Sequence, residues 1–442
     1  MTDSRVPKAN PEEDARLRRE RWNWVEPVVW TDPMLAALEN GVKGGRWYSL
    51  MDKVCARRTL DASWKRVRRN KGAAGVDAVS VERFAAHAER YLDEVSEALR
   101  TGTYRPQGVR RVFIEKTGGG QRPLGIPTVK DRVVQGALKL VLEPIFEREF
   151  CSWSYGFRPG RSAKDALREV DGALKAGSTW VVDADLKSYF DTIPHERLME
   201  RVADRVSDGR VLKLIGVYLK QEIMGGLESW TPIQGTPQGA VLSPLLANLY
   251  LHEMDCLLGA QHHIVRYADD FVVLCATESE AGEALDKVAA WTEQAGLILH
   301  PDKTHVGDCR EVGQGFEFLG YRFEAGHRTV RPKSLKSFKD RIRQRTRRTR
   351  GDSVKHIIED INPMLRGWFG YFKHAHYWTF NTMDGFVRRR LRAVRRKQQK
   401  RPGQGHTFDD HQRWPNRYFA ELGLFTLESA HRQASQSRCG NT

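Results

Sequence analysis

Apolar and polar positions alternate along the chain in two rhythms, one typical of helices and one typical of strands. Apolar residues at helical spacing predict amphipathic helices over 81–99, 131–147 and 281–294. Further helices are expected between Trp22 and Leu60, from Ala163 onward and over 242–250. Residues 1–20 are charged and show no periodicity, so they are interpreted as a flexible lead-in.

Short apolar runs rich in β-branched and aromatic residues predict the strands. Residues 111–127 are expected to form a hairpin around the glycines at 118–120. Further short strands are predicted over 180–182, 297–299 and 316–321. The chain therefore mixes helices with short strands joined by turns.

The stretch 266–271 places two adjacent acids, Asp269 and Asp270, between two apolar runs. These runs predict two strands, with the acids at the tip of the hairpin that joins them. An unpaired buried carboxylate is costly, so the acids are expected to face a cleft or a cation. A solvated Asp-Asp turn is the alternative, and a third carboxylate nearby would favour the cation.

The third carboxylate is expected from the strand that follows Trp180. Its period-two alternation puts Asp183 and Asp185 on one side of the strand and Val182 and Ala184 on the other. Together with the two hairpin acids, Asp185 could bind two Mg²⁺ ions, with Mn²⁺ as an alternative ion. In two-metal phosphoryl transfer such ions lie roughly 3.5–4 Å apart.

Composition points to a polyanionic partner. The 442 residues contain 72 Lys and Arg against 56 Asp and Glu, a formal net charge of +16, which favours nucleic acid over a membrane. A merely basic soluble protein is the alternative. No 18-residue apolar window predicts a membrane span. The six cysteines form no Cys-x-x-Cys pair, which indicates neither a zinc ribbon nor a disulfide framework and fits a reducing cytosol.

Two basic features lie outside the acidic stretches. Lys116 and Arg122 flank the glycine turn of the first hairpin and could hold a triphosphate, or could be two exposed cations. After Phe323 the composition becomes strongly basic, with aromatic residues over 364–372. The expected RNA-binding arginines are Arg345, Arg347, Arg348, Arg388, Arg389 and Arg390. A solvated charged face is the alternative for them.

The motif Tyr267-Ala268-Asp269-Asp270 resembles the Tyr-x-Asp-Asp signature of reverse transcriptases, and the chain resembles a bacterial group II intron reverse transcriptase, or maturase. Eight blocks follow the order expected of that family: 70–77, 122–138, 155–162, 183–195, 234–250, 265–274, 296–304 and 315–321. Residues 365–368 and 414–416 resemble the family's maturase, or thumb, region.

This resemblance implies an α+β fold, a right-hand polymerase whose fingers and palm carry an antiparallel sheet and whose thumb is helical. The expected division is an N-terminal extension over 1–60, fingers and palm over 61–325, and a helical thumb and maturase region over 326–442. Many family members continue into an endonuclease with paired cysteines; these 442 residues contain no such pair, so the chain is expected not to cut a second DNA strand.

The resemblance also assigns roles to single residues. Asp185-Leu186-Lys187 matches the motif of the first metal-binding acid, which favours Asp185 over Asp183. Phe190 matches the bulky residue that excludes a ribose 2′-hydroxyl, with plain core packing as the alternative. The remaining matches are Lys116 and Arg122 for the triphosphate, Gln238 and Gly239 for the nucleotide and template, and Lys303 as a cation near the palm.

The implied function is an RNA-directed DNA polymerase that extends a DNA primer on an RNA template with dNTPs in the bacterial cytosol. The same protein would bind its group II intron RNA, assist splicing and support retrohoming. The alternatives are a splicing-only maturase with a vestigial polymerase, a reverse transcriptase recruited to another task such as phage defence, and an RNA-dependent RNA polymerase.

Overall fold

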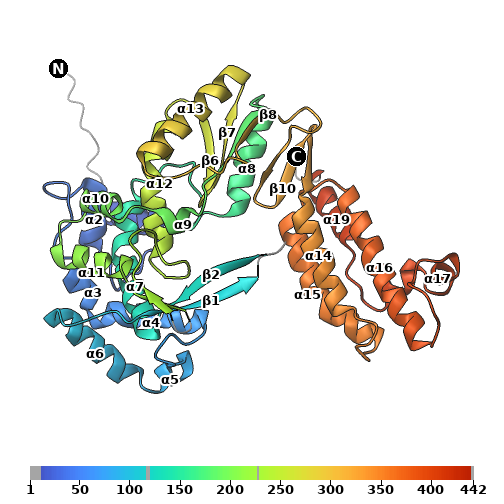
Figure 1. Ribbon diagram of the computed structural model, residues 1–442, viewed down its shortest axis with the longest axis horizontal. Coiled ribbons are helices and arrows are strands. Elements are labelled where there is room, and N and C mark those ends of the chain that lie inside the picture. The colour runs from blue at the N-terminus through green and yellow to red at the C-terminus, as the bar shows by residue number, and fades with distance from the viewer. Residues whose placement is uncertain (1–10, 116–119, 226–227, 440–442) are drawn as a thin grey trace.

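The computed structural model describes residues 11–115, 120–225 and 228–439 (Figure 1). The first part of the chain is helical apart from one hairpin. Its elements are α1 (Pro11–Arg21), α2 (Asp32–Asn40), α3 (Met51–Cys55), α4 (Arg57–Asn70), α5 (Val81–Ala86), α6 (Ala88–Thr101), β1 (Val109–Glu115), β2 (Gln121–Ile126) and α7 (Val129–Glu147). Helix α7 is the centre of this part, because most of its side chains are buried and it packs against α3, α4 and α6.

The central part contains the sheet that carries the predicted acids. Its elements are α8 (Ala163–Lys175), β3 (Trp180–Asp185), α9 (Tyr189–Thr192), α10 (His195–Ala203), α11 (Gly209–Leu219), β4 (Ile223–Gly225), β5 (Glu228–Trp230), α12 (Ser243–Gly259), β6 (His263–Tyr267), β7 (Asp270–Cys275), α13 (Glu278–Gln294) and β8 (His305–Asp308). The strand order is β6-β7-β3-β8, with antiparallel neighbours throughout. A second sheet, β2-β1-β4-β5, joins the hairpin β1–β2 to the central part.

The two faces of the central sheet bury different hydrophobic clusters. Val182 and Val273 belong to the cluster that includes α7, α12 and α13. Val181 and Val272 belong to the cluster that includes α8 and the C-terminal helices. Because successive strand residues point to opposite faces, the sheet is covered on both sides and is the layer that the rest of the molecule packs around.

The C-terminal part is a small antiparallel sheet followed by helices, which lie together at the right of Figure 1. Its elements are β9 (Phe316–Phe318), β10 (Tyr321–Glu324), β11 (His327–Val330), α14 (Pro332–Arg345), α15 (Val354–Phe372), α16 (Trp378–Gln398), α17 (Phe408–Arg413), α18 (Asn416–Glu421) and α19 (Leu427–Cys439). The α+β fold predicted from the sequence is confirmed. The division at residues 60 and 325 stays a prediction.

The main hairpins and helices lie where the sequence predicts them, with four corrections. The helix predicted over 81–99 is two helices, because His87 leaves the helical conformation with φ of −131° and ψ of 25°. The strand predicted over 297–299 is wrong, since Leu299 forms only an isolated bridge with Leu186. The strand predicted over 316–321 is interrupted at Leu319 and Gly320, where φ is 48° and 87°.

The fourth correction concerns the lead-in. Its described portion, from Pro11, is helix α1 rather than a flexible segment. Arg18 pairs with Glu39 at 2.9 Å and Arg19 pairs with Asp32 at 2.6 Å, so ion pairs rather than an apolar stripe hold α1 against α2. Within the described ranges, no helix is long and apolar enough to cross a membrane.

Helices α4 and α7 approach so closely that a glycine is needed at position 136. A Cβ there would lie 2.2 Å from Ser63 Oγ but 3.4 Å from Ser63 Cβ. We therefore predict that Gly136→Ala lowers the free energy of unfolding by about 1–3 kcal/mol through overpacking, and that adding Ser63→Ala restores part of the loss.

The control is Gly172→Ala on α8, where a Cβ meets nothing within 4 Å. It should be neutral or stabilise by about 0.5–1 kcal/mol. Urea denaturation of the four proteins measures both effects. An equal loss at both glycines would contradict the close-packing explanation.

Candidate active site

The three predicted carboxylates meet at one end of the central sheet. Strands β3 and β7 pair antiparallel with Asp185 directly opposite Asp270. Strands β6 and β7 form a hairpin in which Tyr267 pairs with Asp270, leaving Ala268 and Asp269 as its two-residue turn. Ala268 has a positive φ of 61°, as such tight turns require. The hairpin and the alternation on β3 therefore bring Asp185, Asp269 and Asp270 together.

Burial makes this acidic cluster electrostatically unfavourable without a counter-charge. Burial raises the pKa of Asp270 to about 7, with the charges of Asp183 and Asp269 adding to the effect. Burial also raises the pKa of Asp269, an effect that Asp185 increases and Arg122 opposes. Asp183 has its pKa raised to about 7, again chiefly by burial. Carboxylate oxygens are the ligands that a hard divalent cation prefers, so the chemistry of these acids fits such an ion.

Lys303 is next to the first of these acids. Its Nζ donates to Asp185 Oδ2 at 2.7 Å. The preceding loop is fixed by two backbone hydrogen bonds, from Lys187 N to Ile298 O and from His300 N to Asp185 O, each 2.8 Å long. The lysine side chain is 58% exposed, so the pair contributes little stability. The ion pair nevertheless places an exposed positive charge beside Asp185.

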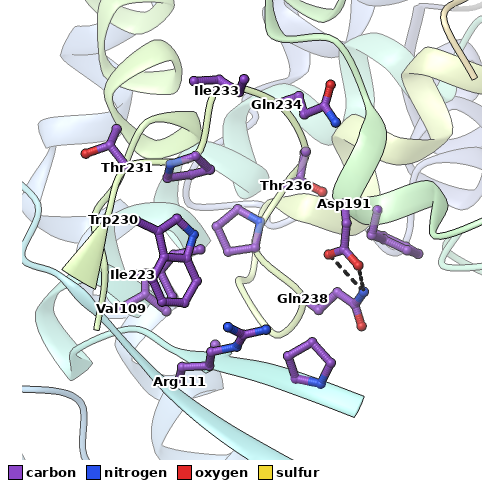
Figure 2. Close-up of a pocket in the computed structure, with 16 residues that line it drawn as sticks. Val109, Arg111, Asp191, Ile223, Trp230, Thr231, Ile233, Gln234, Thr236 and Gln238 are labelled. Atoms are coloured by element: carbon purple, nitrogen blue, oxygen red, sulfur yellow. Dashed lines mark hydrogen bonds between the residues drawn. The ribbon is translucent and has the colours of Figure 1, made fainter. Parts of the chain in front are cut away.

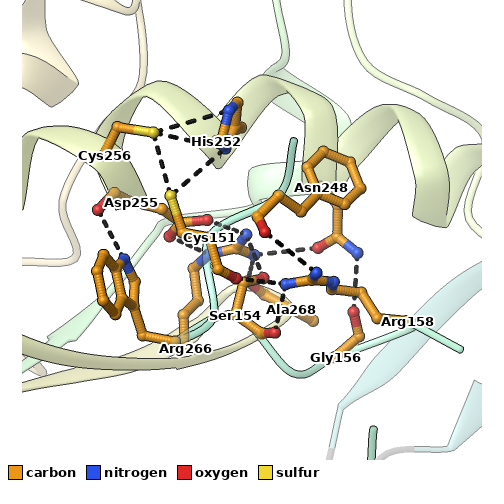
Figure 3. A network of polar contacts seen from close by, with 12 residues as sticks. Cys151, Ser154, Gly156, Arg158, Asn248, His252, Asp255, Cys256, Arg266 and Ala268 are labelled. Carbon is orange, nitrogen blue, oxygen red and sulfur yellow. Dashed lines mark hydrogen bonds and ion pairs between the residues drawn. The ribbon is translucent and has the colours of Figure 1, made fainter. Parts of the chain in front are cut away.

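A buried arginine behind the hairpin holds the acidic turn (Figure 3). Arg266 has no exposed surface. Its guanidinium donates to both carboxylate oxygens of Asp255, at 2.6 and 2.5 Å. It also donates to Asn248 Oδ1 at 3.1 Å and to Ser154 Oγ at 2.7 Å. The fifth N–H bonds to the carbonyl of Ala268 at 2.7 Å, so all five donors have partners.

A glycine allows the loop before α8 to pass directly beneath the same turn. A Cβ on Gly156 would lie 2.2 Å from the backbone nitrogen of Ala268. The carbonyl of Gly156 accepts a hydrogen bond from Asn248 Nδ2 at 2.8 Å. Arg158 closes this loop by donating to Glu147 and to the carbonyl of Ser154. The acidic turn therefore packs against the backbone of this loop in addition to its hydrogen bond from Arg266.

A support that the sequence did not reveal reaches the acids from the C-terminal helices. The backbone N–H of Leu319 hydrogen-bonds to the carboxylate of Asp270, which opposes the rise of its pKa. Tyr371 on α15 donates to the carbonyl of Leu319 at 2.8 Å. Tyr321 in turn donates to the carbonyl of Tyr371 at 2.6 Å. No local pattern signals this contact, because it joins residues about fifty positions apart.

A hollow of about 600 Å³ lies between strands β1 and β2 and the loop 230–238 (Figure 2), and its lining includes none of the three acids. Phe190 and Gln238 both line it. Gln238 Nε2 lies 3.1 Å from each carboxylate oxygen of Asp191. Arg111 stacks over the ring of Trp230 with its Cζ 4.8 Å from the ring centroid. The hollow combines aromatic, amide and cationic groups.

The other residues assigned to the nucleotide have different settings. Phe190 is half-buried and contacts Tyr189 edge to face, with 5.5 Å between ring centroids. Gly239 has a φ of 104°, and a Cβ there would lie 2.5 Å from the carbonyl oxygen of Gly125. Arg122 is exposed on β2. Lys116, which the sequence assigned to the triphosphate, lies outside the described residues.

The six arginines assigned to RNA do not share one environment. Arg345 pairs with Asp360 at 2.7 Å, and Arg388 lies 4.0 Å from the Asp384 carboxylate. Arg390 holds the end of α14 by donating to the carbonyl of Thr346 at 2.8 Å. The other three are Arg347 and Arg389, which are exposed, and Arg348, which is half-buried.

Comparison with known proteins gave two family matches. A model described as reverse transcriptase (RNA-dependent DNA polymerase) matches residues 114–323, and one described as group II intron, maturase-specific domain matches residues 335–414. Protein YkfC of Escherichia coli strain K12 is 36% identical over 296 residues, which cover 57% of this chain and 77% of YkfC.

Two further similarities span less of the compared protein. The group II intron-encoded protein LtrA of Lactococcus lactis subsp. cremoris is 40% identical over 190 residues, covering 42% of this chain and 31% of LtrA. Among solved structures, a chain of a partial Cas6-RT-Cas1–Cas2 complex is 26% identical with a TM-score of 0.36, covering 55% of this chain and 41% of that one.

The buried pair behind the acidic turn should be costly to break from one side. We predict that Arg266→Met lowers the free energy of unfolding by about 3–5 kcal/mol, because the Asp255 carboxylate is left buried and unpaired. The double variant Arg266→Met/Asp255→Leu should lose less than the single one.

The control is Arg100→Met, which breaks an ion pair with Glu97 in which both side chains are more than half exposed. It should cost less than about 1 kcal/mol. Urea denaturation distinguishes the cases, and a double variant less stable than Arg266→Met would contradict the explanation from unpaired charge.

Proposed function

This chain belongs to the group II intron reverse transcriptases, a family of RNA-directed DNA polymerases, and we propose that it works by two-metal nucleotidyl transfer. The observation that carries this proposal is the pairing of Asp185 opposite Asp270, with Asp269 in the adjoining turn. The repulsion among these buried carboxylates would be relieved when cations bind between them.

The acids Asp185, Asp269 and Asp270 would hold the divalent ions, which we propose are Mg²⁺ with Mn²⁺ as an alternative. When bound, such ions activate a primer 3′-hydroxyl and neutralise the charge of a triphosphate and its leaving group. Lys303, bonded to Asp185, balances the charge of that acid before ions and substrate arrive. Arg122 provides positive charge toward Asp269 from the hairpin β1–β2.

The hollow between the hairpin β1–β2 and the loop 230–238 is the proposed site for the incoming dNTP and the template base. Phe190 borders it and would pack under the sugar, where a ribose 2′-hydroxyl would collide with the ring. Gln238 and Gly239 lie on the loop opposite β2, close enough for Gly125 N to donate to Gln238 O at 2.7 Å. This loop can therefore position a nucleotide against the hairpin.

The C-terminal helices are the proposed surface for intron RNA and for the template–primer. A hollow of about 470 Å³ between α14 and α15 is lined by Arg331, Lys333 and Arg341. The side chain of Trp368 also lines it. Cations beside an aromatic ring suit contact with phosphates and stacking with bases. Through this surface the protein would assist splicing and retrohoming of its intron.

The test of the polymerase is primer extension on an RNA template with Mg²⁺ and dNTPs. Asp270→Ala should abolish extension while changing RNA affinity no more than a few-fold, because the acid would bind ions rather than template. Activity that survives in Asp270→Ala would refute the metal assignment. A wild type that supports splicing but never extends a primer would favour a splicing-only maturase.

Selection against ribonucleotides should depend on the aromatic ring in the hollow. Phe190→Val should lower the ratio of dNTP to rNTP incorporation by about tenfold or more, because the ring that meets the 2′-hydroxyl is removed. Ile233→Ala, an 89% exposed position lining the same hollow, should leave the ratio unchanged. Single-nucleotide incorporation kinetics measure both, and an unaltered ratio in Phe190→Val would leave the ring as core packing.

The exposed arginines should contribute more to RNA affinity than those engaged in ion pairs. Arg347→Gln/Arg389→Gln should weaken binding of intron RNA and reduce the slope of log K against log salt concentration by about 0.7–0.9 per lost phosphate contact. Arg168→Gln on α8, a 76% exposed arginine, is the matched control. Filter binding over a salt series measures the slope. An unchanged slope would locate the RNA surface elsewhere.

A further inference from the structure

Three side chains with soft or borderline metal-ligating atoms converge behind the acidic turn (Figure 3). Cys151 lies in the loop after α7, while His252 and Cys256 occupy successive turns of one face of α12. The sulfur atoms of the two cysteines are 3.1 Å apart. Nδ1 of His252 lies 3.8 Å from Cys151 Sγ and 3.7 Å from Cys256 Sγ. Nε2 of His252 is also 3.7 Å from Cys256 Sγ, so the imidazole lies within 4 Å of both sulfurs.

These distances approach those of ligands that share one tetrahedral ion. With zinc–sulfur bonds of about 2.3 Å and zinc–nitrogen bonds of about 2.0–2.1 Å, two ligands lie about 3.5 Å apart for a sulfur and a nitrogen and about 3.8 Å for two sulfurs. The observed sulfur–nitrogen distances exceed that value by only a few tenths of an ångström. The sulfurs would have to separate by about 0.7 Å to reach this spacing, which the exposed Cys256 side chain permits.

We propose that Cys151, His252 and Cys256 bind a zinc ion that fastens the 150–158 loop to helix α12. Two thiolates and one imidazole are the donor set that zinc prefers over the oxygen-seeking Mg²⁺. Since Cys256 is exposed, solvent can supply the fourth ligand.

The surroundings of the cluster are already ordered, as expected of a structural metal site. The carbonyl of Cys151 accepts a hydrogen bond from Arg158, which is buried. His252 contacts the ring of Phe150 edge to face, with 5.6 Å between centroids. Asp255, the residue before Cys256, accepts a hydrogen bond from Trp153 at its carbonyl and binds Arg266 through its carboxylate. The ion would therefore join the two segments that hold Arg266.

This inference is independent of the polymerase proposal, because it involves a different set of donors. A thiolate-bound ion has a spectroscopic signature that carboxylates cannot produce. The full-length protein, reduced and freed of metal with a chelator, would be titrated with Co²⁺ and then with Zn²⁺. We expect a thiolate-to-cobalt charge-transfer band that saturates at one equivalent and disappears on adding Zn²⁺. The Asp270→Ala protein should behave identically.

Variants make the assignment specific. Cys256→Ser should lose the band and His252→Asn should weaken Co²⁺ affinity at least tenfold, while Cys55→Ser, a buried cysteine elsewhere in the fold, should keep both. Because Cys256 is exposed, its serine variant should unfold at nearly the wild-type temperature without metal, and only the wild type should be stabilised by Zn²⁺.

Several results would overturn the proposal. They are the lack of a charge-transfer band in the wild type, an equal band in Cys256→Ser, or equal stabilisation of both proteins by Zn²⁺. Recovery of a Cys151–Cys256 disulfide from protein that binds no metal when reduced would identify a redox pair instead.

Discussion

The guanidinium of Arg266 is the group on which the architecture of the site depends. A charge with no exposed surface is tolerated only when every donor has a partner, and the five hydrogen bonds of Arg266 go to four residues in three separate segments. Asp255 and Asn248 come from α12, Ser154 from the loop before α8, and Ala268 from the acidic turn itself. Satisfying one cation therefore fixes a helix, a loop and a hairpin relative to one another.

A single residue also joins separate segments on the side of the acids that faces the C-terminal helices. Leu319, in the turn between β9 and β10, donates to Asp270 and accepts from Tyr371. The acid is thus held by the central sheet on one side and, through a single turn, by α15 on the other. Arg392, which is buried in the C-terminal helices, makes a comparable local contact by donating to the carbonyl of Trp414 at 3.0 Å.

Local periodicity was sufficient to predict much of the fold and the acidic cluster. Alternation along 180–185 put Asp185 on the opposite side from Ala184, and the apolar runs around Asp269 implied the hairpin. Contacts that join distant segments could not be predicted in this way. Arg266 and Asp255 meet only because α12 packs on β6, and no local sequence pattern indicates that they pair.

The cysteines and the basic arginines illustrate the same limit. A search for short Cys-x-x-Cys spacing misses Cys151 and Cys256, which lie 105 positions apart in sequence and become neighbours through the fold. Among the arginines, a run such as 388–390 indicates charge but not direction. Adjacent residues of a helix point in different directions. On α16, Arg390 points inward to the carbonyl of Thr346, whereas Arg389 is exposed and lies over the ring of Phe386.

The hydrogen bond from Tyr371 to the carbonyl of Leu319 restricts the movement of α15 relative to the central sheet. If helix α15 moved away from the central sheet with this hydrogen bond intact, Tyr371 would draw the turn at Leu319 away from Asp270. A displacement of α15 is transmitted to Asp270 through Tyr371 and Leu319, so the position of the C-terminal helices and the position of this acid are coupled.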